Sequence, residues 1–270
     1  MISSLSIVFM AVSALICFTV PFVLAVVFKK KGLGTWKAFW FGALGFLVLQ
    51  MFIRIPLLQV IGIQTWFISM NLVLLALFLS TTAGLFETIG RYLVFKLLLR
   101  KNRSYGDGLM AGLGHGGIEA IVIVGFTFIN NIVLSLLANM GQAELMLGKS
   151  ASDPAAQAGL AQAVDALAQT IPPMFLLGGI ERIFTIVIHI ALSLFVLEGI
   201  KRKKGFLYCL FAFLFHSILD FTAAILALNE INTILIEFVV LGFALLSLWY
   251  ILLAKRRYSN IGELEAADVE

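Results

Sequence analysis

About seven long apolar runs divide this chain and leave little sequence between them. A run of about 20 apolar residues is long enough to cross the hydrocarbon core of a bilayer as an α-helix. Hydrophobic residues make up 61% of the chain and charged residues 13%, which indicates a polytopic membrane protein. The predicted fold class is all-α, a transmembrane helical bundle, because open strands cannot satisfy their backbone groups in lipid. The expected spans are about 4–28, 35–60, 66–95, 105–137, 172–200, 205–228 and 232–254.

Lysine and arginine are distributed unevenly among the connections. Most of the 19 basic residues follow the first, third, fifth or last run. The positive-inside rule then predicts an external N-terminus and a cytosolic C-terminus, in a multi-pass protein of a bacterial plasma membrane. The net charge of +4 reflects this topology and does not indicate a nucleic-acid partner. The basic residues of these connections are Lys29–Lys31, Lys37, Lys96, Arg100, Lys101, Arg103, Lys201–Lys204 and Lys255–Arg257.

The two ends of the chain carry further expectations. No basic residue precedes the first run and a lysine triplet follows it, so we expect no cleavable signal peptide. Residues 1–258 are expected to form the integral membrane domain, with core helices over about 65–228. The acidic segment 259–270 is expected to be a disordered cytosolic tail. Cys17 and Cys209 fall within spans and are interpreted as free thiols.

The longest connection, about 138–171, is expected on the outer side. Asp153-Pro154 is a helix start signal, with a capping acid followed by proline at the first helical position. Leu160, Val164 and Leu167 then recur at helical spacing, which predicts a short amphipathic helix. We favour a packing role for this helix, over the outer ends of the fourth and fifth spans, above a role as a substrate-gating lid.

All three histidines lie inside apolar runs, at a similar distance from a basic cluster. His115, His189 and His216 are 10 to 12 residues from the nearest such cluster on their own span. At a rise of about 1.5 Å per residue, each lies roughly 15–18 Å below one membrane face. Glycines surround His115, at Gly112, Gly114, Gly116 and Gly117, and they predict close approach of a neighbouring helix.

Each histidine also has an acidic residue on its own helix face. His115 precedes Glu119 by four residues, His216 precedes Asp220 by four, and Glu181 lies two turns before His189. Ionisable groups at this depth are costly, so they mark a functional site by default. Imidazoles and carboxylates at one level suggest hydrolytic chemistry inside the bilayer. For Glu181, a structural pair with Arg91 or Arg182 is an equal alternative.

A further intramembrane pair lies at the end of the third span. Glu87 and Arg91 are four residues apart and share a helix face, so they can form an ion pair. One interpretation is a structural brace, with Arg91 reaching toward the cytosolic surface. The other is a carboxylate poised as a general base, which the matching depth of the histidines favours.

These residues resemble the YhfC family of intramembrane peptidases, within the superfamily of type II CAAX prenyl proteases and bacteriocin-processing homologues; the PrsW proteases are more distant relatives. The superfamily motifs are Glu-x-x-x-Arg, a second-helix histidine and a final His-x-x-x-Asn/Asp. Glu87/Arg91, His115 and His216/Asp220 match them, and Gly-His-Gly-Gly-Ile-Glu, ending at Glu119, is similar to the YhfC version of the second motif. His189 would be the third-motif histidine.

The resemblance implies an intramembrane endopeptidase. Glu87 and His115 would activate a water molecule to attack a peptide carbonyl, and His189 would assist or coordinate. His216 with Asp220 would stabilise the oxyanion. Two departures weaken the transfer of exact roles and of CAAX specificity. Phe86 stands where the type II CAAX enzymes have a second glutamate, and Ala111 stands where they have phenylalanine.

The sequence leaves the cofactor and the alternatives open. His115, His189 and His216 could bind zinc, but a metal-free glutamate mechanism is favoured because no His-Glu-x-x-His motif supplies two imidazoles from one helix. The expected partners are the lipid bilayer and a membrane-embedded or membrane-associated peptide or protein substrate. A proton-coupled transporter or a non-catalytic membrane scaffold remains the rival interpretation, since buried acids and histidines also build proton relays.

Overall fold

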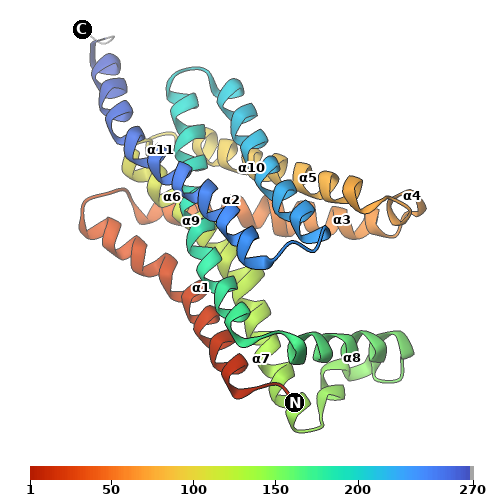
Figure 1. The fold of residues 1–270 in the computed structure, drawn as a ribbon. Helices are drawn as coiled ribbons and strands as arrows, with labels where there is room; N and C mark the ends of the chain where they lie inside the picture. The colour runs from red at the N-terminus through yellow and green to blue at the C-terminus, as the bar shows by residue number, and fades with distance from the viewer. Residues whose placement is uncertain (268–270) are drawn as a thin grey trace. The chain divides into compact units, whose positions relative to one another are not determined.

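The computed structural model describes the backbone of residues 1–267 and the side chains of residues 1–260, and all regular secondary structure in this part of the chain is helical (Figure 1). The predicted all-α class is therefore confirmed. The elements in chain order are α1 (Ser4–Lys30), α2 (Trp36–Phe46), η1 (Leu47–Arg54), α3 (Ile55–Gly62), α4 (Thr65–Ile68), α5 (Leu72–Leu93), η2 (Val94–Leu98), α6 (Tyr105–Glu119), η3 (Ala120–Gly125), α7 (Phe126–Asn139), η4 (Ala143–Ser150), α8 (Pro154–Gln169), α9 (Pro172–Lys201), α10 (Gly205–Leu228) and α11 (Thr233–Ala267).

Within these residues, 7 helical stretches are long and apolar enough to cross a membrane, as predicted. The third of them differs in its start. It was expected from about residue 66, but α5 begins at Leu72 because the Asn71 side chain accepts a hydrogen bond from the Leu74 amide at 2.9 Å and caps the helix. The stretches are Ser4–Lys30, Trp36–Gly62, Leu72–Leu98, Tyr105–Asn139, Pro172–Lys201, Gly205–Leu228 and Thr233–Asn260.

The last helix extends into the segment that was expected to be a disordered tail. α11 continues to Ala267, so residues 259–267 are helical. The physical reason is local: this segment contains leucine, glutamate and alanine, which favour helices, and it has no proline to stop the helix that enters it. The rest of the expected tail, residues 268–270, lies outside the described residues.

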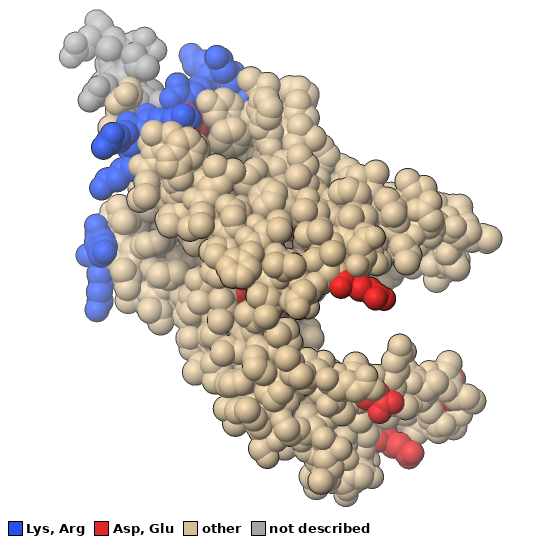
Figure 2. Space-filling model, viewed as in Figure 1, with Lys and Arg blue, Asp and Glu red and all other residues tan. Residues whose placement is uncertain are grey.

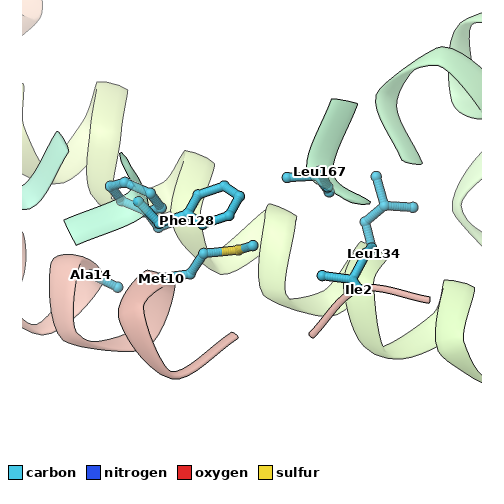
Figure 3. Packing of buried hydrophobic residues seen from close by; sticks show 7 residues of the cluster. Ile2, Met10, Ala14, Phe128, Leu134 and Leu167 are labelled. Atoms are coloured by element: carbon cyan, nitrogen blue, oxygen red, sulfur yellow. The ribbon is translucent and has the colours of Figure 1, made fainter. Parts of the chain in front are cut away.

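The chain folds into two compact units, and α1 and α9 contribute residues to both. Unit 1 comprises Met1–Val20 and Ala120–Ile183. Figure 3 shows part of its apolar core, in which side chains from the start of the chain, α7, α8 and α9 pack together. The buried members of this core are Ile2, Met10, Ala14, Phe128, Leu134, Leu167 and Phe175.

Helix α8 lies in unit 1 and begins where the sequence predicts. Asp153 is its N-cap, and the side chain accepts a hydrogen bond from the Ala155 amide at 2.9 Å. Leu167 is buried in the unit 1 core, and Leu160 and Val164 pack against that core. The amphipathic helix is therefore confirmed. Its apolar face is covered by unit 1, as the packing interpretation requires.

Unit 2 comprises Pro21–Glu119 and Phe184–Glu270, and glycines bring its helices close together. A Cβ atom on Gly42 of α2 would collide with the backbone of Ala111 on α6, and one on Gly114 of α6 would collide with the carbonyl group of Phe39. On another face of α6, a Cβ on Gly112 would lie 2.5 Å from the Cα of Ile190 in α9. The segment that carries His115 is thus held between α2 and α9 at backbone-contact distance.

Basic side chains gather at one end of unit 2. Figure 2 shows them over the region where Figure 1 places the α1–α2 connection, the α9–α10 connection and the part of α11 that precedes the grey end of the chain. Lys29, Lys30, Lys203 and Lys255 are among the exposed basic residues of these segments. This gathering is the arrangement that the distribution of lysine and arginine in the sequence predicts for one membrane face.

Candidate active site

Glu87 of α5 lies at the centre of a buried cluster in unit 2. Its side chain is 4% exposed. Its Oε1 atom accepts a hydrogen bond from Gln50 Nε2 at 2.7 Å. Nitrogen atoms from four other side chains surround Oε2: Arg91 Nη2 at 3.0 Å, His115 Nε2 at 3.2 Å, His216 Nδ1 at 3.4 Å and His189 Nδ1 at 3.6 Å.

Arg91 turns inward and does not reach the membrane surface, contrary to one interpretation of the sequence. Its side chain is 1% exposed, and Nη2 lies 2.5 Å from Nδ1 of His189 as well as 3.0 Å from Glu87. The inward position follows from the buried Glu87 carboxylate, whose charge would be left uncompensated without Arg91. Because a guanidinium can only donate, Nδ1 of His189 is the acceptor, and the proton of this imidazole is on Nε2.

Two histidines have acidic partners on helices other than their own. His115 Nε2 lies 3.2 Å from Glu87 Oε2 of α5. His189 Nε2 of α9 lies 2.9 Å from Glu119 Oε2 of α6. The glycines of α6 bring α9 close enough for this contact between helices.

His216 keeps the partner that the sequence predicts. Its Nε2 atom lies 3.4 Å from Asp220 Oδ2 on the same face of α10. Nδ1 of the same ring points to Glu87, so the imidazole stands between two carboxylates. Asp220 thereby orients a ring that faces the centre of the cluster.

The three imidazole rings meet although they come from three different helices. The ring centroids of His115 and His189 are 5.3 Å apart, and those of His189 and His216 are 5.6 Å apart. Phe46 of α2 covers the edge of His115, with 5.3 Å between the ring centroids. The structure therefore brings together every residue that the sequence proposes for the site: Glu87, Arg91, His115, Glu119, His189, His216 and Asp220.

Gln50 is a site residue that the sequence analysis does not identify. It is buried in η1, a π-helical segment that continues α2, and its amide nitrogen donates to Glu87 at 2.7 Å. Arg54, one turn later, donates to the Gln50 side-chain oxygen at 3.2 Å and to the Leu79 carbonyl at 2.8 Å. The sequence signal that could have identified Gln50 is its spacing from Arg54: two polar residues lie four positions apart in an otherwise apolar run. π-helical turns are rare and occur often at functional sites.

Two carboxylates are the most exposed acidic groups of the cluster. The Asp220 side chain is 34% exposed and that of Glu119 is 15% exposed, whereas the three imidazoles are at most 7% exposed.

Two other acids have structural partners. Glu181, in unit 1, forms an ion pair with its neighbour Arg182, which is one of the structural alternatives that the sequence offers. Glu198 of α9 is fully buried and accepts hydrogen bonds from Arg202 Nε at 2.7 Å and from the Tyr250 hydroxyl at 2.8 Å. These contacts tie α9 to α11 near the basic end of unit 2.

Four residues of the cluster could hold a metal ion. One ligand atom from each of Glu87, His115, Glu119 and His189 can be chosen so that all lie within 4.8 Å of one another. Ligand atoms of a tetrahedral zinc site with bonds of about 2.0–2.2 Å are roughly 3.3–3.6 Å apart, and imidazole and carboxylate are accepted ligands. The donor set thus fits a divalent transition metal. It differs from the three histidines expected, because carboxylates take the place of His216.

Comparisons with known proteins agree with this chemistry. A family model described as "YhfC intramembrane metalloprotease" matches residues 16–241, which include the whole cluster. The "Uncharacterized membrane protein YhfC" of Bacillus subtilis (strain 168) is 34% identical over 261 residues, covering 95% of this chain and 99% of the relative. No solved structure matches the chain. The family description favours the metal-dependent alternative over the metal-free one predicted from the sequence.

Proposed function

The chain belongs to the YhfC intramembrane metalloprotease family, and we propose that it hydrolyses a peptide bond of a membrane-embedded or membrane-associated protein. The observation that carries this proposal is the convergence of three imidazoles on the buried Glu87 carboxylate, at 3.2 to 3.6 Å. The expected location is the bacterial cell membrane. The relative in B. subtilis is called a membrane protein, and this chain has 7 candidate spans.

Glu87 acts as the general base in this proposal. Its carboxylate is held in place by Gln50 at 2.7 Å and by Arg91 at 3.0 Å. Removed from bulk water, it takes a proton from the attacking water molecule and passes it to the leaving amine. His115, 3.2 Å from the same oxygen, orients the water and shares its proton.

His216 is the proposed donor to the oxyanion. Its ring is fixed by Asp220 at 3.4 Å, and its Nδ1 atom faces the centre where the carbonyl oxygen would develop charge. A donor that is already oriented stabilises that charge without reorganisation during the reaction. Asp220 acts through His216 and is a positioning residue.

The cluster also suits the metal that the family description implies. His115, His189 and Glu119 would hold it beside Glu87, which would stay the base, and the metal would polarise the peptide carbonyl and acidify water. The proton of the His189 ring is on Nε2, which lies 2.9 Å from Glu119 Oε2. Coordination through that nitrogen would therefore release this proton, as expected for an imidazole ligand.

The experiment that tests the function is a comparison of the parent with Glu87→Gln. The amide keeps the shape and removes the base, so cleavage should fall on the order of 10²–10⁴-fold. A substrate would be identified by comparing cells that contain the parent with cells that contain Glu87→Gln. Fragments of membrane proteins that appear only with the parent would come from it. The rate would then be measured on that substrate with purified protein in liposomes, at matched folded amounts.

Glu230→Gln is the matched control, because Glu230 is exposed in the turn between α10 and α11. It should cleave at the parent rate. Equal rates for Glu87→Gln and the parent would exclude hydrolysis by this site. Solute movement across the liposome would then support the transporter interpretation, and the absence of both activities would support a scaffold.

A further inference from the structure

Arg54 is a charged residue inside a candidate span, and it donates hydrogen bonds to three uncharged acceptors. It lies in Trp36–Gly62, at the end of η1, and it is half-buried. Nη1 donates to Gln50 Oε1 at 3.2 Å, Nε to Thr82 Oγ1 at 3.1 Å and Nη2 to the Leu79 carbonyl at 2.8 Å. Charged groups inside a span are costly and mark a functional site by default, so the role of Arg54 has to be sought in these contacts.

Two of the three bonds hold Arg54 to the helix that carries Glu87. Leu79 and Thr82 belong to α5, and Glu87 follows Thr82 by five residues. The Thr82 hydroxyl in turn donates to the Leu79 carbonyl at 3.0 Å, so the two acceptors are bonded to each other. A guanidinium is a rigid planar fork. Two bonds to α5 therefore also fix the direction of the N–H group that points to Gln50.

The third bond determines which way the Gln50 amide faces. A guanidinium can only donate a hydrogen bond, and an ionised carboxylate can only accept one. The amide between Arg54 and Glu87 therefore has one orientation that satisfies both neighbours, with its oxygen toward Arg54 and its nitrogen toward Glu87. The contacts have this orientation, since Gln50 Nε2 donates to Glu87 Oε1 at 2.7 Å. Arg54 thus ensures, through the amide, that Glu87 receives a donor.

The opposite orientation of the amide would displace the general base. If the Gln50 amide were turned by half a rotation, its oxygen would face the Glu87 carboxylate, and two acceptors would oppose each other. The carboxylate would then move from the position in which Oε2 faces the three imidazoles. A displacement of about 1 Å at a catalytic centre can cost on the order of 10²-fold in rate.

We propose that Arg54 is a positioning residue of the peptidase centre. It fixes the Gln50 amide, and the fixed amide occupies Oε1 of Glu87 and leaves Oε2 to take the proton of the attacking water. Arg54 acts through Gln50, because its three hydrogen bonds go to groups other than Glu87. This inference rests on the proposed function. It adds to the site a residue of the second span, which the sequence motifs do not include.

The orientation of the amide can be tested without a substrate. In detergent-solubilised protein with ¹⁵N-labelled glutamine side chains, the Gln50 signal is the one that is missing from Gln50→Leu. Its N–H groups should exchange slowly with deuterated water in the parent, because the amide is buried and bonded on both sides. Arg54→Met should accelerate this exchange about tenfold or more, the size of one hydrogen bond to a charged group. Exchange as slow as in the parent would overturn the proposal.

Thr82→Val is the matched control for this measurement. It removes the acceptor of Arg54 Nε but leaves the bonds of Arg54 to Gln50 and Leu79. The Gln50 N–H groups should therefore exchange as slowly as in the parent. Equal acceleration by Thr82→Val and Arg54→Met would show that exchange follows the packing of η1 on α5, and it would contradict an orienting role.

Turnover separates an orienting residue from a structural one. At matched folded amounts, Arg54→Met should lower kcat roughly 10- to 100-fold, the size of one hydrogen bond to a charged group, with KM nearly unchanged. Arg54→Lys should restore most of kcat, since an ammonium group also only donates. Arg100→Met should cleave at the parent rate, because Arg100 is exposed and bonds to the Lys96 carbonyl. Equal losses in Arg54→Lys and Arg54→Met would assign Arg54 to a structural role that needs the planar fork.

Gln50→Leu tests whether Arg54 acts through the amide. Once the amide is removed, adding Arg54→Met should cause no further loss of kcat. Residues that act through one another in this way have non-additive effects. If the losses of the two single variants multiplied in the double variant, Arg54 would act by another route and the proposal would be wrong.

The two proposals can fail separately, because amide exchange requires no turnover. Accelerated exchange in Arg54→Met, in a protein whose parent never cleaves a membrane peptide, would contradict the proposed hydrolysis and leave the orientation of Gln50 by Arg54 standing. Cleavage by the parent with kcat unchanged in Arg54→Met would contradict the positioning role alone.

Discussion

Glu87 shows how single residues in this protein depend on partners from several helices. Its carboxylate is bonded to Gln50 of η1 and Arg91 of α5 and faces imidazoles from α6, α9 and α10. Removing one partner of a buried charge pair is strongly destabilising, typically by about 3–5 kcal/mol, because the other charge stays buried. Variants at this centre therefore need conservative replacements and a measured folded fraction, or lost folding will be mistaken for lost catalysis.

The donor geometry predicts which histidines retain a metal. His115 and His189 belong to the group that can place ligand atoms around one point, whereas His216 does not. We expect purified protein to carry about one divalent transition metal per chain, as zinc sites with three or four protein ligands do. His115→Ala or His189→Ala should remove most of it, and His216→Ala should retain it. The measurement is metal content by mass spectrometry, together with the Kd for added zinc.

The His216→Ala variant is the internal control of that experiment, since it removes an imidazole from the same cluster. If all three variants lost metal equally, His216 would be a metal ligand. The ligand set would then be the three histidines that the sequence predicts. Metal well below one equivalent in the parent, with cleavage that resists chelators, would instead support the metal-free glutamate mechanism.

At the scale of helices, the sequence predicts positions along each helix better than contacts between helices. The depth of His115, His189 and His216 follows from counting residues to a basic cluster, and their rings do meet. Their partners could not be assigned in this way. Glu119 reaches His189 only because α6 and α9 approach at backbone distance around Gly112.

Gln50 illustrates a second limit of sequence reasoning. Its contact with Glu87 depends on η1 being π-helical, with wider turns that change which side chains face inward. No residue pattern in Leu47–Arg54 distinguishes π-helical from α-helical turns. The spans could thus be predicted from length and hydropathy, but a partner fixed by local helix geometry could not.

The contact between α2 and α6 predicts a large effect of one added methyl group. In Gly42→Ala the new Cβ would collide with the Ala111 backbone, which cannot rotate away as a flexible side chain could. Overpacking of this kind typically costs about 1–3 kcal/mol. We expect a lower melting temperature in detergent and a loss of cleavage as His115 shifts on α6.

Gly62→Ala is the matched control, since it lies in the same span and a Cβ there would meet no atom within 4 Å. Alanine favours helix over glycine by up to about 1 kcal/mol, so this variant should be neutral or slightly more stable. If both substitutions shifted the melting temperature equally, close packing of α2 on α6 would not be what holds His115 in place.

At the scale of the whole molecule, the length of the helices bears on where the chemistry occurs. α9 has 30 residues and is about 45 Å long at 1.5 Å per residue, well beyond the roughly 30 Å of a hydrocarbon core. His189 lies 12 residues before Lys201 on this helix, about 18 Å from the basic end. The cluster should therefore sit near the middle of the membrane, so that both water and an unwound peptide must be admitted to it.

The uneven distribution of basic residues predicts how the molecule is inserted. Lysine and arginine gather at one end of unit 2, and the positive-inside rule places that end in the cytosol and the N-terminus outside. Reporter fusions at residues 34, 103, 203 and 258 should behave as cytosolic, and a fusion at 155, just after the start of α8, should behave as external. A cytosolic reporter at 155 would invert this topology. The cluster would then keep its geometry, but the basic end of unit 2 would face the outer side of the membrane.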